Sequence, residues 1–282
     1  MRFLIFSITC SVSIAHLFKY AEEKAIPMFS LFAVNYVVGS IIALGGCNST
    51  FQHQLSLLFI VLGLILGVLF VCSYILMVLA IKKLGVTIPV SLMRLSAVLP
   101  TFGSILFFAE VPENLQLAGI ALAFLSLPLA SKERIFMTNL LDVLHNGFGW
   151  GLMLFGVFGI TNFIFKIQQE LIPLDNPYHF LVIIFPVAFL ISATAVIRNK
   201  TPISKRILGV GVALGIINLF SSYFFMKALQ ELPGIVVYPT NGIGIILLSA
   251  LTSPIFWKER LTGNNYIFIA LASVALLLIY PR

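Results

Sequence analysis

Residues 55–81 read LSLLFIVLGLILGVLFVCSYILMVLAI, a stretch that contains no Asp, Glu, Lys or Arg. About 20 apolar residues in an α-helix cross the hydrocarbon core of a bilayer, because each residue adds ~1.5 Å along the helix axis. The charge-free region around this stretch begins at Ala25 and must hold two helices, since Gly45–Thr50 (GGCNST) is a turn signal. We therefore expect membrane-spanning helices at 28–47 and 55–81.

Charged clusters alternate with apolar stretches along the whole chain. Cutting the sequence at these clusters and at Gly, Pro and Asn predicts ten spans, at 2–19, 28–47, 55–81, 86–108, 114–130, 147–166, 177–197, 207–229, 234–256 and 263–281. Hydrophobic residues make up 60% of the 282 residues and charged residues 10%, whereas an ordinary soluble domain is about 25% charged. The predicted fold class is all-α, a polytopic membrane protein with ten transmembrane helices.

The two halves of the chain are related in sequence. A shift of 149 positions superposes Ser73-Tyr74-x-x-Met77 on Ser222-Tyr223-x-x-Met226. The same shift, or one of 147, aligns further residues: Gly85 with Gly234, Glu110 with Glu259, Ile120–Ala123 with Ile269–Ala272, and Phe18-Lys19-x-x-x-Glu23 with Phe165-Lys166-x-x-x-Glu170. Apolar composition alone gives scattered Leu and Ile matches, so these matched glycines and polar residues indicate an internal duplication.

The duplication predicts a first five-helix repeat at 1–134, a connecting loop at 135–146 and a second repeat at 147–282. Because five is an odd number, the second copy enters the membrane from the opposite side. Inverted repeats are the architecture of many secondary transporters, whose substrate site lies near the bilayer midplane where the repeats meet. The repeat therefore favours a carrier that works by alternating access.

Several local motifs accompany the repeat. They are Leu232-Pro233-Gly234-Ile235, Tyr238 leading to Asn241-Gly242-Ile243-Gly244, Trp257-Lys258-Glu259-Arg260-Leu261, and Leu17-Phe18-Lys19-Tyr20. Together with the repeat, these motifs resemble the drug/metabolite transporter superfamily, specifically its ten-span EamA-type members. The resemblance covers nearly the whole chain, and it implies transport of a small solute across a membrane without ATP hydrolysis.

One departure from that superfamily concerns acidic residues. Its four-span small multidrug resistance members carry a carboxylate in their first helix, where this chain has Ser11 and, in the second half, Phe158. All ten acidic residues of this chain lie in predicted loops or at predicted helix ends. Cation–proton antiport by that mechanism is therefore unsupported, and we expect transport to depend only weakly on a pH gradient.

Arg94 is the only ionisable residue well inside a predicted span. Placing Arg in hydrocarbon costs at least about 2.5–3.5 kcal/mol, so its side chain should face a cavity or a partner. The functional interpretation is that Arg94 attracts the carboxylate of a substrate. The alternative is a structural Arg that bonds helix carbonyls or reaches the interface. Ser91 and its repeat equivalent Thr240 are candidate substrate contacts beside it.

Prolines mark the two helices that we expect to line the pathway. Pro89 and Pro100 lie in the fourth predicted span, and Pro239 lies in the ninth, between Tyr238 and Thr240-Asn241. A proline removes one helix hydrogen bond and frees a carbonyl, which a membrane protein tolerates where the freed group meets protein, water or ligand. Tyr238 and Asn241 are therefore candidate substrate contacts. The alternative is a kink that serves packing alone.

Tyr74 and Tyr223, which the repeat makes equivalent, are candidates to close the cavity or stack on the substrate, and Asn162 is a candidate polar contact. The alternatives are tyrosines with a backbone partner or at the interface, and an amide that joins two helices. The three cysteines and four histidines show no disulfide or metal-ligand spacing. We expect no metal, no cofactor and no enzymatic activity.

The net charge of +7 is spread over many interhelical loops, which indicates the lipid bilayer rather than nucleic acid as the partner. The expected function is a secondary carrier or facilitator for a small-molecule substrate, such as an amino acid. We expect it to act as a monomer in the bacterial inner (cytoplasmic) membrane. A multidrug exporter is the alternative within transport, and a membrane scaffold or a membrane-embedded enzyme are alternatives of other classes.

The orientation follows from the loop charges. Lys and Arg gather in the loops after the odd-numbered spans, which by the positive-inside rule puts both termini outside. The family resemblance implies cytoplasmic termini instead. We follow the charge count, because Arg198–Arg206 is a dense basic loop that is hard to translocate.

Overall fold

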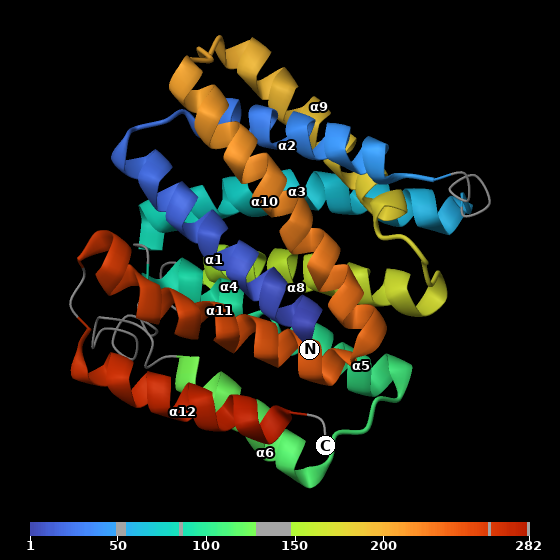
Figure 1. Ribbon diagram of the computed structural model, residues 1–282, viewed down its shortest axis with the longest axis vertical. Helices are drawn as coiled ribbons and strands as arrows, with labels where there is room; N and C mark the ends of the chain where they lie inside the picture. The colour runs from blue at the N-terminus through green and yellow to red at the C-terminus, as the bar shows by residue number, and fades with distance from the viewer. Residues whose placement is uncertain (49–54, 85–86, 128–147, 259–260, 281–282) are drawn as a thin grey trace. The chain divides into compact units, whose positions relative to one another are not determined.

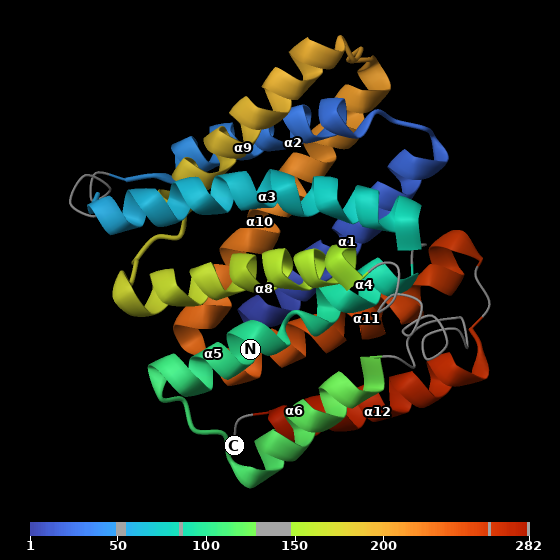
Figure 2. The ribbon, with the colours of Figure 1, turned by 180° about the vertical axis from the view of Figure 1, so that it is seen from behind.

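The computed structural model describes residues 1–48, 55–84, 87–127, 148–258 and 261–280. Within these ranges the regular elements are α-helices, and no strand occurs (Figures 1 and 2). The helices are α1 (Arg2–Glu23), α2 (Met28–Gly46), α3 (Leu57–Leu84), α4 (Thr87–Leu95), α5 (Val98–Phe108), α6 (Asn114–Ser126), α8 (Phe148–Leu171), α9 (Tyr178–Asn199), α10 (Lys205–Glu231), α11 (Gly234–Trp257) and α12 (Gly263–Ile279).

Most of these helices can cross a membrane. Seven are long and apolar enough to do so, and three further apolar stretches of 10–17 residues are shorter. Large apolar side chains face outward, for example Ile41, Leu106 and Leu277, which are 64%, 74% and 74% exposed. Water does not tolerate so many exposed apolar side chains, whereas lipid does. The described part of the chain is thus all-helical, with several helices suited to a multi-pass membrane protein.

The fourth predicted span is broken into α4 and α5 at Ser96–Ala97. Pro100 has no N–H to donate to the Ser96 carbonyl four residues earlier. That carbonyl instead accepts from the Leu99 N–H at 3.0 Å, and the Arg94 carbonyl accepts from the Ala97 N–H at 3.2 Å. These tighter bonds between residues three apart interrupt the regular helix and end α4 just after Arg94.

The helices form two compact units. Unit 1 comprises Met1–Val71 and Ile167–Glu231, and unit 2 comprises Cys72–Lys166 and Leu232–Arg282. Each unit therefore combines helices from both halves of the sequence. These units are defined by packing contacts. The boundaries at 1–134, 135–146 and 147–282 describe a duplication of the sequence, and they stay a prediction. The predicted connecting loop 135–146 lies outside the described residues.

In unit 1, α2 and α9 pack antiparallel. The Asn176 side chain, just before α9, donates to the carbonyl of Gly46 at the end of α2, at 2.8 Å. Further along, a Cβ on Gly39 would lie 2.1 Å from the ring of Phe185. α1 and α10 also run antiparallel, because the Ser7 hydroxyl donates to the Ser221 carbonyl at 3.1 Å while the N-terminal amine lies 3.7 Å from Glu231 at the end of α10.

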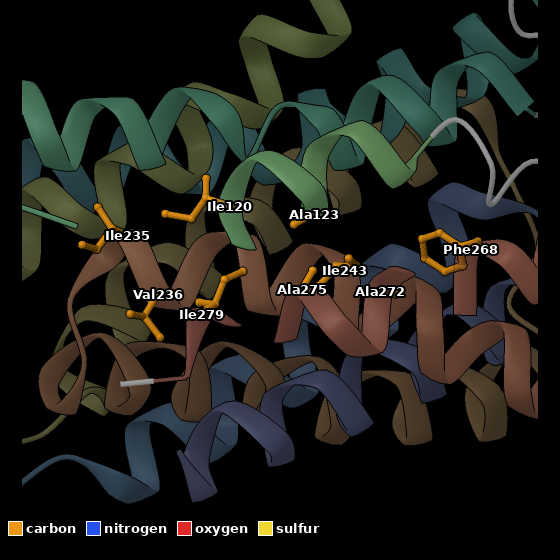
Figure 3. Close-up of a cluster of buried hydrophobic side chains, with 9 residues drawn as sticks. All are labelled: Ile120, Ala123, Ile235, Val236, Ile243, Phe268, Ala272, Ala275 and Ile279. Carbon is orange, nitrogen blue, oxygen red and sulfur yellow. The ribbon is translucent and has the colours of Figure 1, made fainter. Parts of the chain in front are cut away.

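In unit 2, α6 and α12 pack antiparallel around small residues, and α11 adds to the same core. Figure 3 shows the cluster, in which alanines let the helix backbones approach closely. Its members are Ile120, Ala123, Ile235, Val236, Ile243, Phe268, Ala272, Ala275 and Ile279. α5 and α11 are antiparallel too, since Gly242 lies beside Arg94 and Ala97 whereas Gly234 lies beside Ser104.

Candidate functional site

Arg94 occupies the last turn of the short helix α4. The negative end of the helix dipole favours a cation there. Tyr74, on the unit 2 part of α3, is half-buried and interacts electrostatically with the guanidinium. The Nε atom of Arg94 is nevertheless buried with no hydrogen-bond partner among the described residues. Arg94 thus keeps at least one donor available for a further group.

A narrow crevice lies beside Arg94. Its other walls come from Pro239, Gly242 and Ile243 of α11 and from the end of α6 at Phe124. The crevice is too narrow to admit a water molecule. A solute does not fit into this crevice while its walls stand as they do.

Two polar atoms on α11 adjoin the crevice residues without lining the crevice. Within the described part of the chain, Thr240 Oγ1 and Asn241 Oδ1 are buried and have no hydrogen-bond partner. Pro239 precedes them and has no N–H, so the helix bond to the carbonyl of Ile235 is missing. Unpaired polar groups in a buried stretch cost free energy unless a ligand or water satisfies them.

Other predicted site residues are held in fixed contacts. The Tyr238 hydroxyl donates to the carbonyl of Asn162 at 3.0 Å and so ties α11 to α8. Tyr223 belongs to unit 1, where its ring centroid lies 4.7 Å from that of Tyr178, while its repeat equivalent Tyr74 belongs to unit 2. Tyr238 thus has a backbone hydrogen-bond partner on a neighbouring helix.

Residues predicted on the fourth span divide between α4 and α5. Pro89 is buried on α4, and Pro100 is buried in the first turn of α5. Ser91 lies on α4, and its side chain is outside the described structure. The break between α4 and α5 is next to Arg94. In many carriers the break in a discontinuous helix exposes backbone groups to a ligand.

The sequence reasoning missed a second polar cluster in unit 2. The Lys166 amine donates to Glu110 Oε1 at 2.5 Å, and its side chain is 2% exposed, against 12% for Glu110. The same carboxylate accepts from the backbone N–H of Gly234 and of Ile235, both at 2.8 Å. Glu110 therefore caps the N-terminus of α11 from the end of α5 and joins α5, α8 and α11.

Gly234 lies close to α5 at this cap, because a Cβ there would clash with Ser104 Oγ. The repeat singles out Glu110, Lys166 and Gly234 as equivalents of Glu259, Lys19 and Gly85. That match is a sequence signal for special positions, although it does not reveal their mutual contact. Glu259 and Gly85 lie outside the described residues. Across the described residues, no three His, Cys, Asp or Glu side chains are grouped so that they could hold a metal ion.

Comparisons with known proteins bear on the fold and leave the chemistry open. No protein-family model matches the chain. A protein of Haemophilus influenzae, described only as uncharacterized, is 27% identical over 99% of this chain and 98% of its own length. A crystal structure described only as that of a protein superposes with a TM-score of 0.75 at 13% identity, covering 98% of this chain and 95% of the other. The fold therefore recurs in a distant structure.

Proposed function

We propose that this chain is a secondary carrier that moves a small carboxylate-bearing metabolite, such as an amino acid, by alternating access. The observation that carries the proposal is Arg94, a cation among apolar helices whose Nε has no hydrogen-bond partner in the described structure. Holding such a charge at membrane depth costs about 2.5–3.5 kcal/mol on insertion scales. A charged residue is therefore retained inside a membrane mainly where it serves a transport pathway. A planar guanidinium suits bidentate recognition of a carboxylate.

The surroundings of Arg94 support a carrier. The helix that bears it is discontinuous, and the facing helix α11 contains Pro239. Broken helices at a central site are typical of secondary transporters. The crevice beside Arg94 is too narrow for a water molecule, so a solute would enter it only if its walls moved. Binding and release then require helices to move, which is what alternating access means in structural terms.

Contacts within unit 1 support two inverted repeats. A Cβ on any of four glycines would clash with a neighbouring helix: Gly63 with Ile183, Gly67 with Val187, Gly211 with Val34, and Gly215 with Val38. Gly63 and Gly211 are 148 positions apart, and their partners Val34 and Ile183 are 149 apart. Both of these contacts between α3 and α9 thus recur between α10 and α2 with the halves exchanged, as a two-fold axis requires.

The directions of equivalent helices support an axis in the membrane plane. Such an axis reverses the second repeat, so that equivalent helices run in opposite directions. α2 and α9 are equivalent in the predicted repeat, as are α5 and α11, and α6 and α12. All three pairs are antiparallel in their contacts. The seven long apolar helices and the three shorter ones then correspond to the ten proposed spans, in a monomer of a bacterial inner membrane.

A solute screen followed by flux tests the function. Purified protein is heated with single metabolites, and each carboxylate that raises the unfolding temperature is compared with its own methyl ester. We expect the acid to stabilise the protein and the ester not to, because only the acid can pair with Arg94. Liposomes containing the protein should then release the stabilising acid faster than empty liposomes.

Two outcomes would overturn the proposal. Equal stabilisation by acid and ester would remove the role of the carboxylate and favour a multidrug exporter. Stabilisation without any flux, under gradients in either direction, would indicate a membrane protein that binds the solute without carrying it.

A further inference from the structure

A groove of about 450 Å³ opens at one end of unit 1. It lies between two connections, the one from α1 to α2 and the one from α9 to α10. All four of these helices are long and apolar enough to span a membrane. Their ends, and therefore the groove, belong at the level where lipid headgroups meet water.

Three cations surround the groove. Lys24 contributes from the end of α1, and Lys205 and Arg206 contribute from the first turn of α10. All three side chains are exposed, and within the described residues none of them forms an ion pair with a carboxylate. Glu22 and Glu23 precede Lys24 on α1, but neither lines the groove.

The position of two of these cations is electrostatically unfavourable for the protein alone. The first turn of a helix carries a partial positive charge and favours acidic residues, yet the first turn of α10 contains Lys205 and Arg206 and no acidic residue. Lys24 adds a third like charge across the groove. A bound anion would relieve this repulsion.

The floor of the groove is apolar. Ile26 and Ile207 line it and are 7% and 4% exposed, because both belong to the core that α1, α2 and α10 share. Pro27 and Pro202 add further apolar surface. The groove thus offers a cationic rim and an apolar base, which matches an amphiphile better than a free inorganic ion.

We infer that this groove binds the phosphate headgroup of an anionic phospholipid, with Lys24, Lys205 and Arg206 holding the phosphate and the apolar floor receiving the glycerol end of the acyl chains. The loop charges predict that this boundary faces the cytoplasm, where the leaflet is rich in anionic lipid. The inference is independent of the proposed transport, since it concerns a different unit of the chain from Arg94.

A binding experiment with matched charge removal tests the site. Detergent-purified protein is titrated with short-chain phosphatidylglycerol, and lipid adducts are counted by native mass spectrometry. The test variant is Lys24→Gln/Lys205→Gln/Arg206→Gln. The control variant, Lys83→Gln/Lys227→Gln/Lys258→Gln, removes the same charge from residues that do not line the groove. Five of the six side chains are exposed, and Lys227 is half-buried and donates to the Asp175 carbonyl at 3.0 Å. Thermal unfolding without lipid therefore checks that both variants are folded.

We expect the tightest lipid site to weaken by roughly a hundredfold in the test variant and by less than about threefold in the control, because each cation near anionic lipid contributes about fivefold. Phosphatidylcholine should not compete. Equal weakening in both variants would reduce the effect to overall charge and overturn the inference. Displacement of the lipid by millimolar inorganic phosphate would also overturn it, since the groove would then be a site for a free anion.

Discussion

Unit 2 contains two inward cations, the buried Lys166 and the half-buried Arg94, and their hydrogen-bond partners differ. Lys166 donates to Glu110, and that carboxylate also accepts two backbone N–H groups of α11, so the charge is paired and the helix terminus is capped. Arg94 interacts electrostatically with Tyr74, but its Nε has no hydrogen-bond partner in the described structure. Thr240 and Asn241 nearby on α11 also have unpaired polar atoms.

The difference shows that burial of a charge does not by itself indicate a binding site. A buried charge that is paired with a counter-charge stabilises one arrangement of helices, and removing one partner of the pair is strongly destabilising. A buried donor without a partner destabilises the protein while no ligand is bound. A ligand that accepts a hydrogen bond from it removes this penalty, which favours binding. We therefore assign Glu110–Lys166 to the stability of the fold and Arg94 to the proposed substrate.

The largest effect is expected at the paired site. Glu110→Gln leaves the buried Lys166 amine without a counter-charge, and Lys166→Gln leaves the carboxylate unpaired. Each should lower the free energy of unfolding by about 3–5 kcal/mol, as for other broken buried pairs. Thermal and denaturant unfolding in detergent measure the loss.

The double variant Glu110→Gln/Lys166→Gln is the matched control. It removes both charges, so it should be less destabilised than the sum of the two single variants. Full stability of Glu110→Gln, combined with a loss of transport, would reverse the assignment of the two sites.

Arg94 should show the opposite pattern. Arg94→Gln should weaken solute binding roughly ten- to a hundredfold, because one charge-assisted hydrogen bond contributes about 1.5–3 kcal/mol. Arg94→Lys should be impaired as well, since Lys keeps the charge but loses the planar fork. Unfolding should change by no more than about 1 kcal/mol. Calorimetric binding and liposome flux measure the functional loss.

Arg198→Gln, an exposed position at the end of α9, is the control for charge removal. Unchanged affinity and flux in Arg94→Gln would leave only the structural interpretation of Arg94.

Two neighbouring residues of α11 provide a smaller test of the same difference. Tyr238→Phe removes a hydroxyl that is hydrogen-bonded to Asn162 and should cost about 0.5–1.5 kcal/mol of stability with little change in solute affinity. Thr240→Val removes a buried hydroxyl that has no partner in the described structure. It should leave stability unchanged or raised, and weaken solute binding. An effect on stability alone in Thr240→Val would place its hydroxyl in the packing.

The smallest effect is expected at Ser104. It lies near the Glu110–Lys166 pair, but its own buried hydroxyl is unpaired among the described residues. Because Ser104 lies beside Gly234 at the capped end of α11 and does not line the crevice at Arg94, Ser104→Ala should change stability by less than about 1 kcal/mol and leave flux unchanged. A clear loss of flux in Ser104→Ala would extend the pathway to the capped end of α11.

Sequence reasoning located the helices well because burial in lipid depends on local composition. The described helices begin and end within a few residues of the predicted spans, although α1 and α8 extend to Glu23 and Leu171 rather than to residues 19 and 166. Pro100 predicted a disturbance in the fourth span, but the break at Ser96–Ala97 depends on which carbonyls the remaining N–H groups reach.

The candidate site was only partly accessible from the sequence. Arg94 and the prolines were conspicuous because a charge or a missing N–H is rare inside an apolar span. The partners of Glu110 could not be recognised in the sequence. Lys166 and Gly234 are far from Glu110 along the chain, and no local sequence feature indicates that they contact it. The separation of Tyr74 and Tyr223 into two units is likewise a matter of packing.

The sequence by itself determined that the chain is helical, apolar and suited to a membrane, because helix formation and transfer into lipid are sums over neighbouring residues. The tertiary structure alone decided which polar groups are paired: the Glu110 carboxylate is bonded to Lys166 and to the N-terminus of α11, whereas Arg94 retains an unpaired donor within the described structure. Hydrogen bonds between distant helices require atoms to meet within about 3 Å, and only the packed chain brings them there.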